Sequence, residues 1–94
     1  MNTASTVLKD LGISEKHAIR EFALLNSSQK AAEFEQECEA FENKYKMSFQ
    51  ELEQRLQSTD VEVFEQEDDY LAWKFAVEGA RYWRKKTEQL KSES

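Results

Sequence analysis

Paired carboxylates are the first side chains in this sequence that could do chemistry, because two of them can act as a general acid and a general base. Five glutamates alternate through one segment: Glu33, Glu35, Glu37, Glu39 and Glu42. Acid–base catalysis needs the two carboxylates in different environments, with one of them partly desolvated. A helix turns by about 100° per residue, so these five scatter around its exposed arc and stay hydrated. We therefore interpret them as a solvated face or as a docking surface for a basic partner.

His17 and Cys38 are the other residues with catalytic or metal-binding potential. His17 and Glu21 lie four residues apart, but one histidine and one cysteine are too few ligands for a zinc site. Cys38 falls on an apolar stripe, so we predict a buried structural thiol there and an exposed histidine at position 17. The sequence therefore predicts no catalytic residue, no metal site and no cofactor, and a protein that is not an enzyme.

A basic cluster lies near the C-terminus and is interleaved with two rings: Arg81, Tyr82, Trp83, Arg84, Lys85 and Lys86. Such a mixture can bind single-stranded nucleic acid. The same charges also suit the negative end of a helix dipole, or an intermolecular contact with the acidic segment. The sequence pI near 4.8 argues against tight nucleic-acid binding, so we do not expect the chain alone to bind nucleic acid.

The acids are concentrated in one part of the chain. Residues 33–69 hold thirteen acids against three bases, a net charge of −10, whereas the remaining residues hold six acids and ten bases, which gives the total of −6. A concentrated negative charge repels phosphate and attracts basic protein. The distribution predicts a basic protein partner.

The composition predicts a single all-α domain over residues 1–94. The chain has no proline and only two glycines, too few turn residues for a sheet protein, and its eleven aromatic residues are enough to form a core. We find no signal-peptide pattern and no apolar run long enough to span a membrane, so we expect no membrane contact and a cytoplasmic protein.

Three helices are expected. Ser14 is placed to cap the first, in which two apolar stripes, 18–25 and 34–45, are offset by roughly 120° around the helix. Either the helix kinks in the polar stretch 26–28, or one straight helix presents its faces to different neighbours; the straight helix is favoured. Ser48 and Glu51 form a capping box that begins a short second helix of about ten residues. We expect a flexible N-terminal segment at 1–13 and a loop at 58–68.

The last helix begins at Asp68 or Asp69 and is apolar around about two-thirds of its circumference. A helix that lies on a core needs a much narrower stripe. The surplus is covered either by flanking helices or by another chain. For an interface, we predict ring anchors flanked by steering charges, since aromatic anchors carry binding energy and rim charges set encounter rate. The predicted partner-binding residues are Tyr70, Trp73, Trp83, Glu65, Asp68 and Asp69.

Two runs of residues carry a resemblance to a known group of proteins. The pattern F-x-x-x-C-x-x-F-E-x-K-Y-x-M-S-F over residues 34–49, followed by E-D-D-Y-L-x-W-K over 67–74, resembles small acidic helical proteins of bacteria and archaea encoded beside toxin-like genes. The similar part spans about residues 30–75. The resemblance implies an antitoxin that neutralises a basic, RNA-acting toxin by direct contact, and no catalytic residue carries over. The alternative is a homo-oligomeric helical module without a toxin partner.

Overall fold

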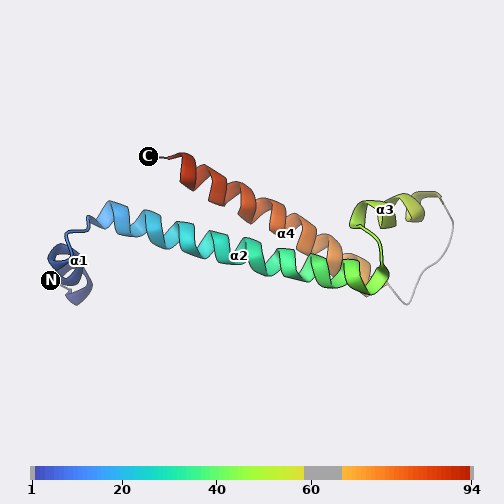
Figure 1. Cartoon of the computed structure of the whole chain (residues 1–94), viewed down its shortest axis with the longest axis horizontal. Helices are drawn as coiled ribbons and strands as arrows, with labels where there is room; N and C mark the ends of the chain where they lie inside the picture. The colour runs from blue at the N-terminus through green and yellow to red at the C-terminus, as the bar shows by residue number, and fades with distance from the viewer. Residues whose placement is uncertain (1, 59–66, 94) are drawn as a thin grey trace.

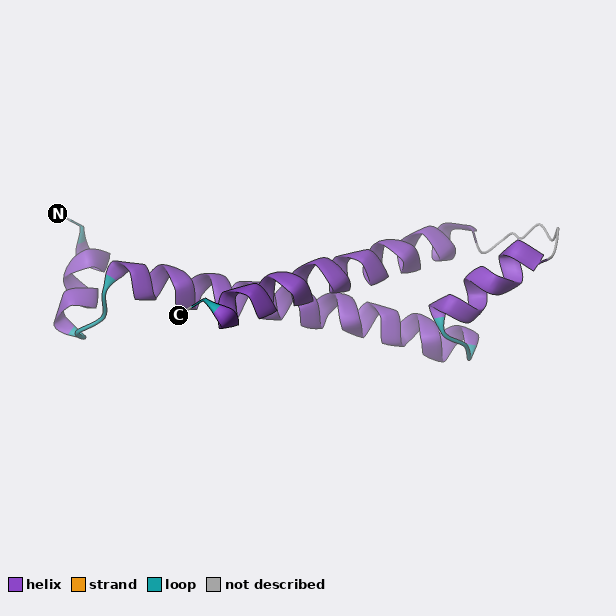
Figure 2. Cartoon of the chain, turned by 90° about the horizontal axis from the view of Figure 1, so that it is seen from above, coloured by secondary structure: helices purple, strands orange, loops and turns teal. Residues whose placement is uncertain are grey.

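The chain forms an elongated antiparallel hairpin of two long helices with a short helix at each end (Figure 1). The structure, a computed structural model, describes residues 2–58 and 67–93. In chain order the helices are α1 (Thr3–Asp10), α2 (Glu15–Tyr45), α3 (Phe49–Ser58) and α4 (Glu67–Ser92), and the described residues include no strand. The predicted all-α class is confirmed. Figure 2 shows α2 and α4 running side by side, and the molecule measures 63 × 24 × 19 Å.

Helix α2 is continuous through the polar stretch where the sequence left a kink open. It begins after Ser14, whose hydroxyl accepts from the N–H of His17 at 3.0 Å, as predicted. The amide of Asn26 donates to the carbonyl of Phe22 at 2.8 Å, and the hydroxyl of Ser27 donates to the carbonyl of Ala23. These side chains bond back by one turn instead of competing for the helix backbone, so the straight helix is confirmed.

The corner between α2 and α3 is built as the sequence indicates. Lys46 ends α2 in the left-handed conformation at φ 56°, and its N–H donates to the carbonyl of Glu42. The Ser48 hydroxyl then accepts from the N–H of Glu51 at 3.1 Å, and the Glu51 carboxylate accepts from the N–H of Ser48 at 3.4 Å. The capping box is thus present, and it begins α3 at Phe49.

The two long helices meet along a repeat of seven residues on each, the pattern of an antiparallel coiled coil. On α2 the buried and half-buried residues of this seam are Arg20, Leu24, Ser27, Ala31, Phe34, Cys38, Phe41 and Tyr45. On α4 they are Asp69, Trp73, Ala76, Ala80, Trp83, Thr87 and Leu90. Small residues let the helices approach closely: a Cβ on Gly79 would lie 2.8 Å from the ring of Phe34.

A cluster of aromatic rings lies beside the α2–α3 corner, around a single tryptophan. Trp73 is fully buried. Its ring stacks on Phe41 at 5.6 Å and on Tyr45 at 5.8 Å between centroids, and Phe49 of α3 meets it edge-on at 5.4 Å. Aromatic pairs at these separations stabilise a core beyond the area that they bury. This cluster fixes α3 and the start of α4 against α2.

The N-terminal segment contains a helix beyond the three that the sequence predicts. Thr3–Asp10 form helix α1, capped by the Asn2 side chain, which accepts from the N–H of Ser5 at 2.7 Å. The flexibility of residues 1–13 stays a prediction. Asparagine is among the best N-cap residues, so Asn2 stabilises the first turn of α1. The predicted loop at 58–68 lies mostly outside the described residues, and α4 begins at Glu67, one residue before the earliest predicted start.

Candidate functional site

Trp73 is not available as a surface anchor. Its side chain has no exposed area, because Phe41, Tyr45 and Phe49 enclose it. A partner could reach this ring only by opening the hairpin. The structure thus places Trp73 at the centre of the core, whereas the sequence analysis assigned it to the partner-binding residues.

Tyr70, the second predicted anchor, is half-buried and is used within the chain. Its ring stacks on Phe49 at 5.6 Å, and its hydroxyl donates to the carboxylate of Glu53 at 3.3 Å. Both contacts join α4 to α3. Only part of this ring remains for another molecule.

Among the predicted steering charges, Asp69 is paired inside the hairpin. Its carboxylate accepts from the ammonium of Lys44 at 2.6 Å and from the hydroxyl of Tyr45. These two hydrogen bonds lower the pKa of Asp69, and the bond to Asp69 in turn raises the pKa of Tyr45. Asp68 is exposed, whereas Glu65 lies outside the described residues. Asp69 thus locks the start of α4 to the end of α2, and Asp68 alone of these three is a described, exposed charge.

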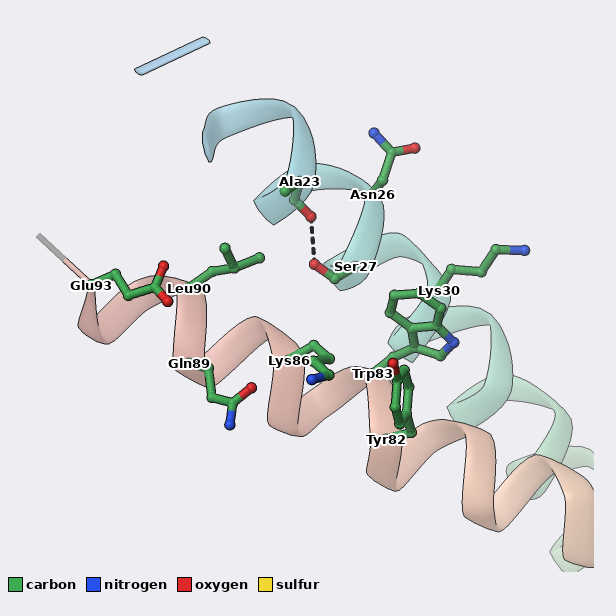
Figure 3. Close-up of a pocket in the computed structure, with 10 residues that line it drawn as sticks. All are labelled: Ala23, Asn26, Ser27, Lys30, Tyr82, Trp83, Lys86, Gln89, Leu90 and Glu93. Carbon is green, nitrogen blue, oxygen red and sulfur yellow. Dashed lines mark hydrogen bonds between the residues drawn. The ribbon is translucent and has the colours of Figure 1, made fainter. Parts of the chain in front are cut away.

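Trp83, the third predicted anchor, lines an open groove between α2 and α4 (Figure 3). Figure 3 shows its indole lying toward Lys30 of α2, with the Tyr82 ring beside it; the two rings meet edge-on at 5.1 Å. The ammonium of Lys86 lies 5.4 Å from the centre of the Tyr82 ring. The groove, about 510 Å³ in volume, is lined by Ala23, Asn26, Ser27, Lys30, Tyr82, Trp83, Lys86, Gln89, Leu90 and Glu93.

Three exposed apolar side chains on α4 form a surface that the sequence assignment missed. Leu71, Phe75 and Tyr82 are 56%, 66% and 53% exposed; we call them the α4 stripe. Leu71 and Phe75 each lie two residues from Trp73, so they point roughly 160° away from it around the helix. The Phe75 ring also meets the edge of Phe34 at 5.6 Å, which holds it against the hairpin. The two-residue spacing from Trp73 shows in the sequence that Leu71 and Phe75 lie on the opposite side of the helix. The sequence alone did not show which of these sides packs against α2.

The long helices divide the charge between two ends. Around the α2–α3 corner, residues 31–45 and 67–80 carry nine acids against two lysines, which we call the acidic end. At the opposite end, residues 15–30 and 81–92 carry eight bases against three acids. The predicted basic cluster touches the acidic residues within the chain: the guanidinium of Arg84 donates to both carboxylate oxygens of Glu35, at 2.6 and 3.2 Å.

The remaining chemistry candidates show no catalytic arrangement. Cys38 is half-buried, and its thiol pKa is raised, first by burial and then by the negative charges of Glu42, Glu37 and Glu35. A raised pKa lowers the thiolate fraction and hence the reactivity. His17 is exposed, 3.9 Å from Glu21. Over residues 2–58 and 67–93, no group of three or more potential ligands is placed to hold a metal ion, and no helix could cross a membrane.

The comparisons with known proteins identify no relative: no family model, no curated protein and no solved structure matches this chain. The fold and the surface define the molecule as a charge-polarised helical hairpin with exposed rings on its outer faces.

Proposed function

We propose that this chain is a non-catalytic protein-binding protein that uses the α4 stripe and the acidic end to hold a basic protein. The observation that carries the proposal is the position of Leu71 and Phe75, two large apolar side chains exposed within the acidic end. An apolar anchor among charges that are mostly of one sign suits an interface with an oppositely charged partner.

The exposed area of the chain supports a binding role. It exposes 7355 Å² of surface at a mass of 11.1 kDa, whereas a compact monomer of that mass exposes about 5,700 Å². A standard interface buries about 800 Å² on each partner. The excess is therefore large enough to be covered by one or two partners.

The antitoxin role is the biological form of this proposal that the resemblance favours. A toxin that acts on RNA carries a basic surface for the phosphates, because neutralising phosphates supplies most of the affinity for nucleic acid. Carboxylates of the acidic end would occupy the same surface and exclude RNA. The steering charges are the exposed acids beside the α4 stripe, such as Asp68 and Glu78, and not the paired Asp69.

Co-expression with the product of the neighbouring gene tests the proposal. We expect the two proteins to co-purify and the partner's ribonuclease activity to be inhibited. Phe75→Ala should weaken binding by about tenfold to a hundredfold, as loss of an interface ring does. Gln89→Ala, on the same outer face of α4 but at the basic end, is the matched control and should bind normally. Equal affinity of the two variants would contradict the assigned surface, and a neighbour product that does not bind would remove the antitoxin role.

Salt dependence provides a second test. Neutralising Asp68 and Glu78 together should slow association mostly at low ionic strength, since exposed charges are screened within about 8 Å at physiological salt. Stopped-flow rates at two salt concentrations measure this. A rate that is unchanged at low salt would exclude electrostatic docking at the acidic end.

A further inference from the structure

A second exposed apolar surface lies on α2, at the end of the hairpin away from the acidic end. Ile19 and Phe22 are each 70% exposed and Leu25 is 58% exposed; we call these three residues the α2 stripe. Phe22 lies two residues from both Arg20 and Leu24 of the seam, about 200° around the helix from each. The stripe therefore faces away from α4, and no described element covers it.

The stripe is short and bounded. Asn26, which follows Leu25, points away from α4 in Figure 3, and polar residues continue the same face at Gln29, Glu33 and Gln36. The apolar part thus covers about two turns near the start of α2. This is the first of the two offset stripes in the sequence; the second faces α4, and the first lacks a neighbour within the described chain.

We infer that the α2 stripe binds the α2 stripe of a second copy of this chain, in antiparallel orientation about a two-fold axis at Phe22. The spacing carries this orientation: Ile19 precedes Phe22 by three residues and Leu25 follows it by three. In an antiparallel pair centred on Phe22, the two Phe22 rings meet, and Ile19 of each copy meets Leu25 of the other. A two-fold interface requires such a self-complementary patch.

The charges near the α2 stripe also favour a second copy of this chain as the partner that binds it. The stripe itself carries no charge, so it offers nothing to the basic partner proposed above or to a nucleic acid. Two exposed residues that flank it along α2 have opposite charges: Glu15, and Lys30, which also lines the groove beside Trp83. In the antiparallel register, Glu15 of one copy falls within one turn of Lys30 of the other, and the symmetry forms this pair twice. In a parallel pair, Glu15 would face Glu15.

The available area predicts a weak, concentration-dependent dimer. Three side chains supply less than the standard area of about 800 Å² on each partner. Leu11, 65% exposed, and Val7, 47% exposed, belong to the same end of the molecule as the stripe and can extend the contact. The acidic ends of the two hairpins would point in opposite directions, so both α4 stripes would remain open.

Sedimentation equilibrium of the isolated full chain over a wide concentration range tests the inference. We expect a monomer–dimer equilibrium whose dissociation constant rises at least tenfold in Phe22→Ser. Phe75→Ser, a matched ring in the α4 stripe, should lose the basic partner and keep the dimer. A chain that is monomeric at every concentration, or a dimer lost equally in both variants, would overturn the inference. Neither result bears on the binding of the basic partner, because that is measured separately.

Cysteine cross-linking tests the orientation, in a Cys38→Ser background. Phe22→Cys should form a disulfide-linked dimer under mild oxidation, because the two-fold axis brings the two positions within the separation of about 7 Å that a disulfide spans. A mixture of Ile19→Cys and Leu25→Cys chains should cross-link to each other faster than either does to itself. Gln36→Cys, on the polar continuation of the same face, is the control. Faster pairing of Ile19→Cys with itself, or of the control than of Phe22→Cys, would overturn the antiparallel arrangement.

Discussion

At the scale of single residues, the side of the helix that an aromatic ring occupies decides whether the ring stabilises the core or is exposed for binding. Trp73 and Phe75 are two residues apart in the sequence, yet one is fully buried and the other is 66% exposed. The sequence identified the aromatic richness of this helix correctly. It did not identify the buried ring, because composition alone does not say which face meets α2.

Trp73→Ala should therefore destabilise the hairpin by about 3–5 kcal/mol, the usual cost of removing a buried tryptophan. Phe75→Ala is the matched control, and its effect on stability should be much smaller because most of that ring is already hydrated. Urea unfolding followed by circular dichroism measures both. Similar losses for the two variants would contradict the packing around Trp73.

The contact of Asp69 with Lys44 and Tyr45 should make stability depend on pH. The pKa of Asp69 is lowered, mainly by the hydrogen bonds from Lys44 and Tyr45, so its contribution is present above the ordinary carboxyl value of about 4 and is lost as the pH falls through the folded-state pKa. The pKa values of Lys44 and Tyr45 are raised, so their contribution is present below about pH 10 and is lost at higher pH.

Urea midpoints at pH 7 and pH 2 provide the measurement. Asp69→Asn should lower the midpoint at pH 7, and its effect should shrink as the pH falls through the folded-state pKa of Asp69, because the wild-type carboxyl then becomes protonated and neutral like the amide. Asp68→Asn replaces the exposed neighbour and serves as the control. A larger effect of Asp69→Asn at pH 2 than at pH 7 would reverse the assigned sign.

At the scale of elements, helix ends were the most predictable feature. The Ser14 cap, the capping box of Ser48 and Glu51 and the corner between α2 and α3 depend on local hydrogen bonds, which adjacent residue types specify. The pairing of helix faces was less predictable, because it depends on where the partner helix lies. The offset between the stripes of α2 was visible in the sequence, but the neighbour of each stripe was not.

Among the helix ends in residues 2–58 and 67–93, Lys46 is the one whose backbone conformation conflicts with its residue type. Its backbone is left-handed at φ 56°, a conformation that costs a residue with a Cβ roughly 1 kcal/mol and that glycine adopts freely. Lys46→Gly should therefore stabilise the chain by about 1 kcal/mol, measured by thermal or urea unfolding. Lys46→Ala, which keeps the Cβ, is the control and should bring no such gain. Destabilisation by glycine would show that the corner has another conformation.

At the scale of the whole molecule, the length of the hairpin is its most testable property. The radius of gyration of the Cα atoms is 19.6 Å, whereas a compact chain of this length has about 12 Å. Small-angle X-ray scattering at low concentration should give a value near 20 Å and a distance distribution that extends to about 60 Å, as the principal extent of 63 Å requires. A value near 12 Å would mean that the chain is a compact globule and not an extended hairpin, and the exposed stripes would then be covered.

The sequence also predicted the acidic region of the molecule. Acids that are close together in the sequence stay close together in the folded chain, because the antiparallel hairpin brings residues 31–45 beside residues 67–80. The sequence did not predict that the basic residues gather at the opposite end of the hairpin. That arrangement depends on where the chain turns between α2 and α4 and not on composition.

The two tryptophans give this molecule separate optical reporters of folding and of contact. Trp73 is shielded from water, so its fluorescence should be blue-shifted and should move to the red only when the hairpin unfolds. Trp83 lines an open groove, and its emission should respond to occupation of that groove while the chain stays folded. In Trp83→Phe the emission would report unfolding alone, so a spectral change that survives this substitution on addition of a partner would mean that binding loosens the core.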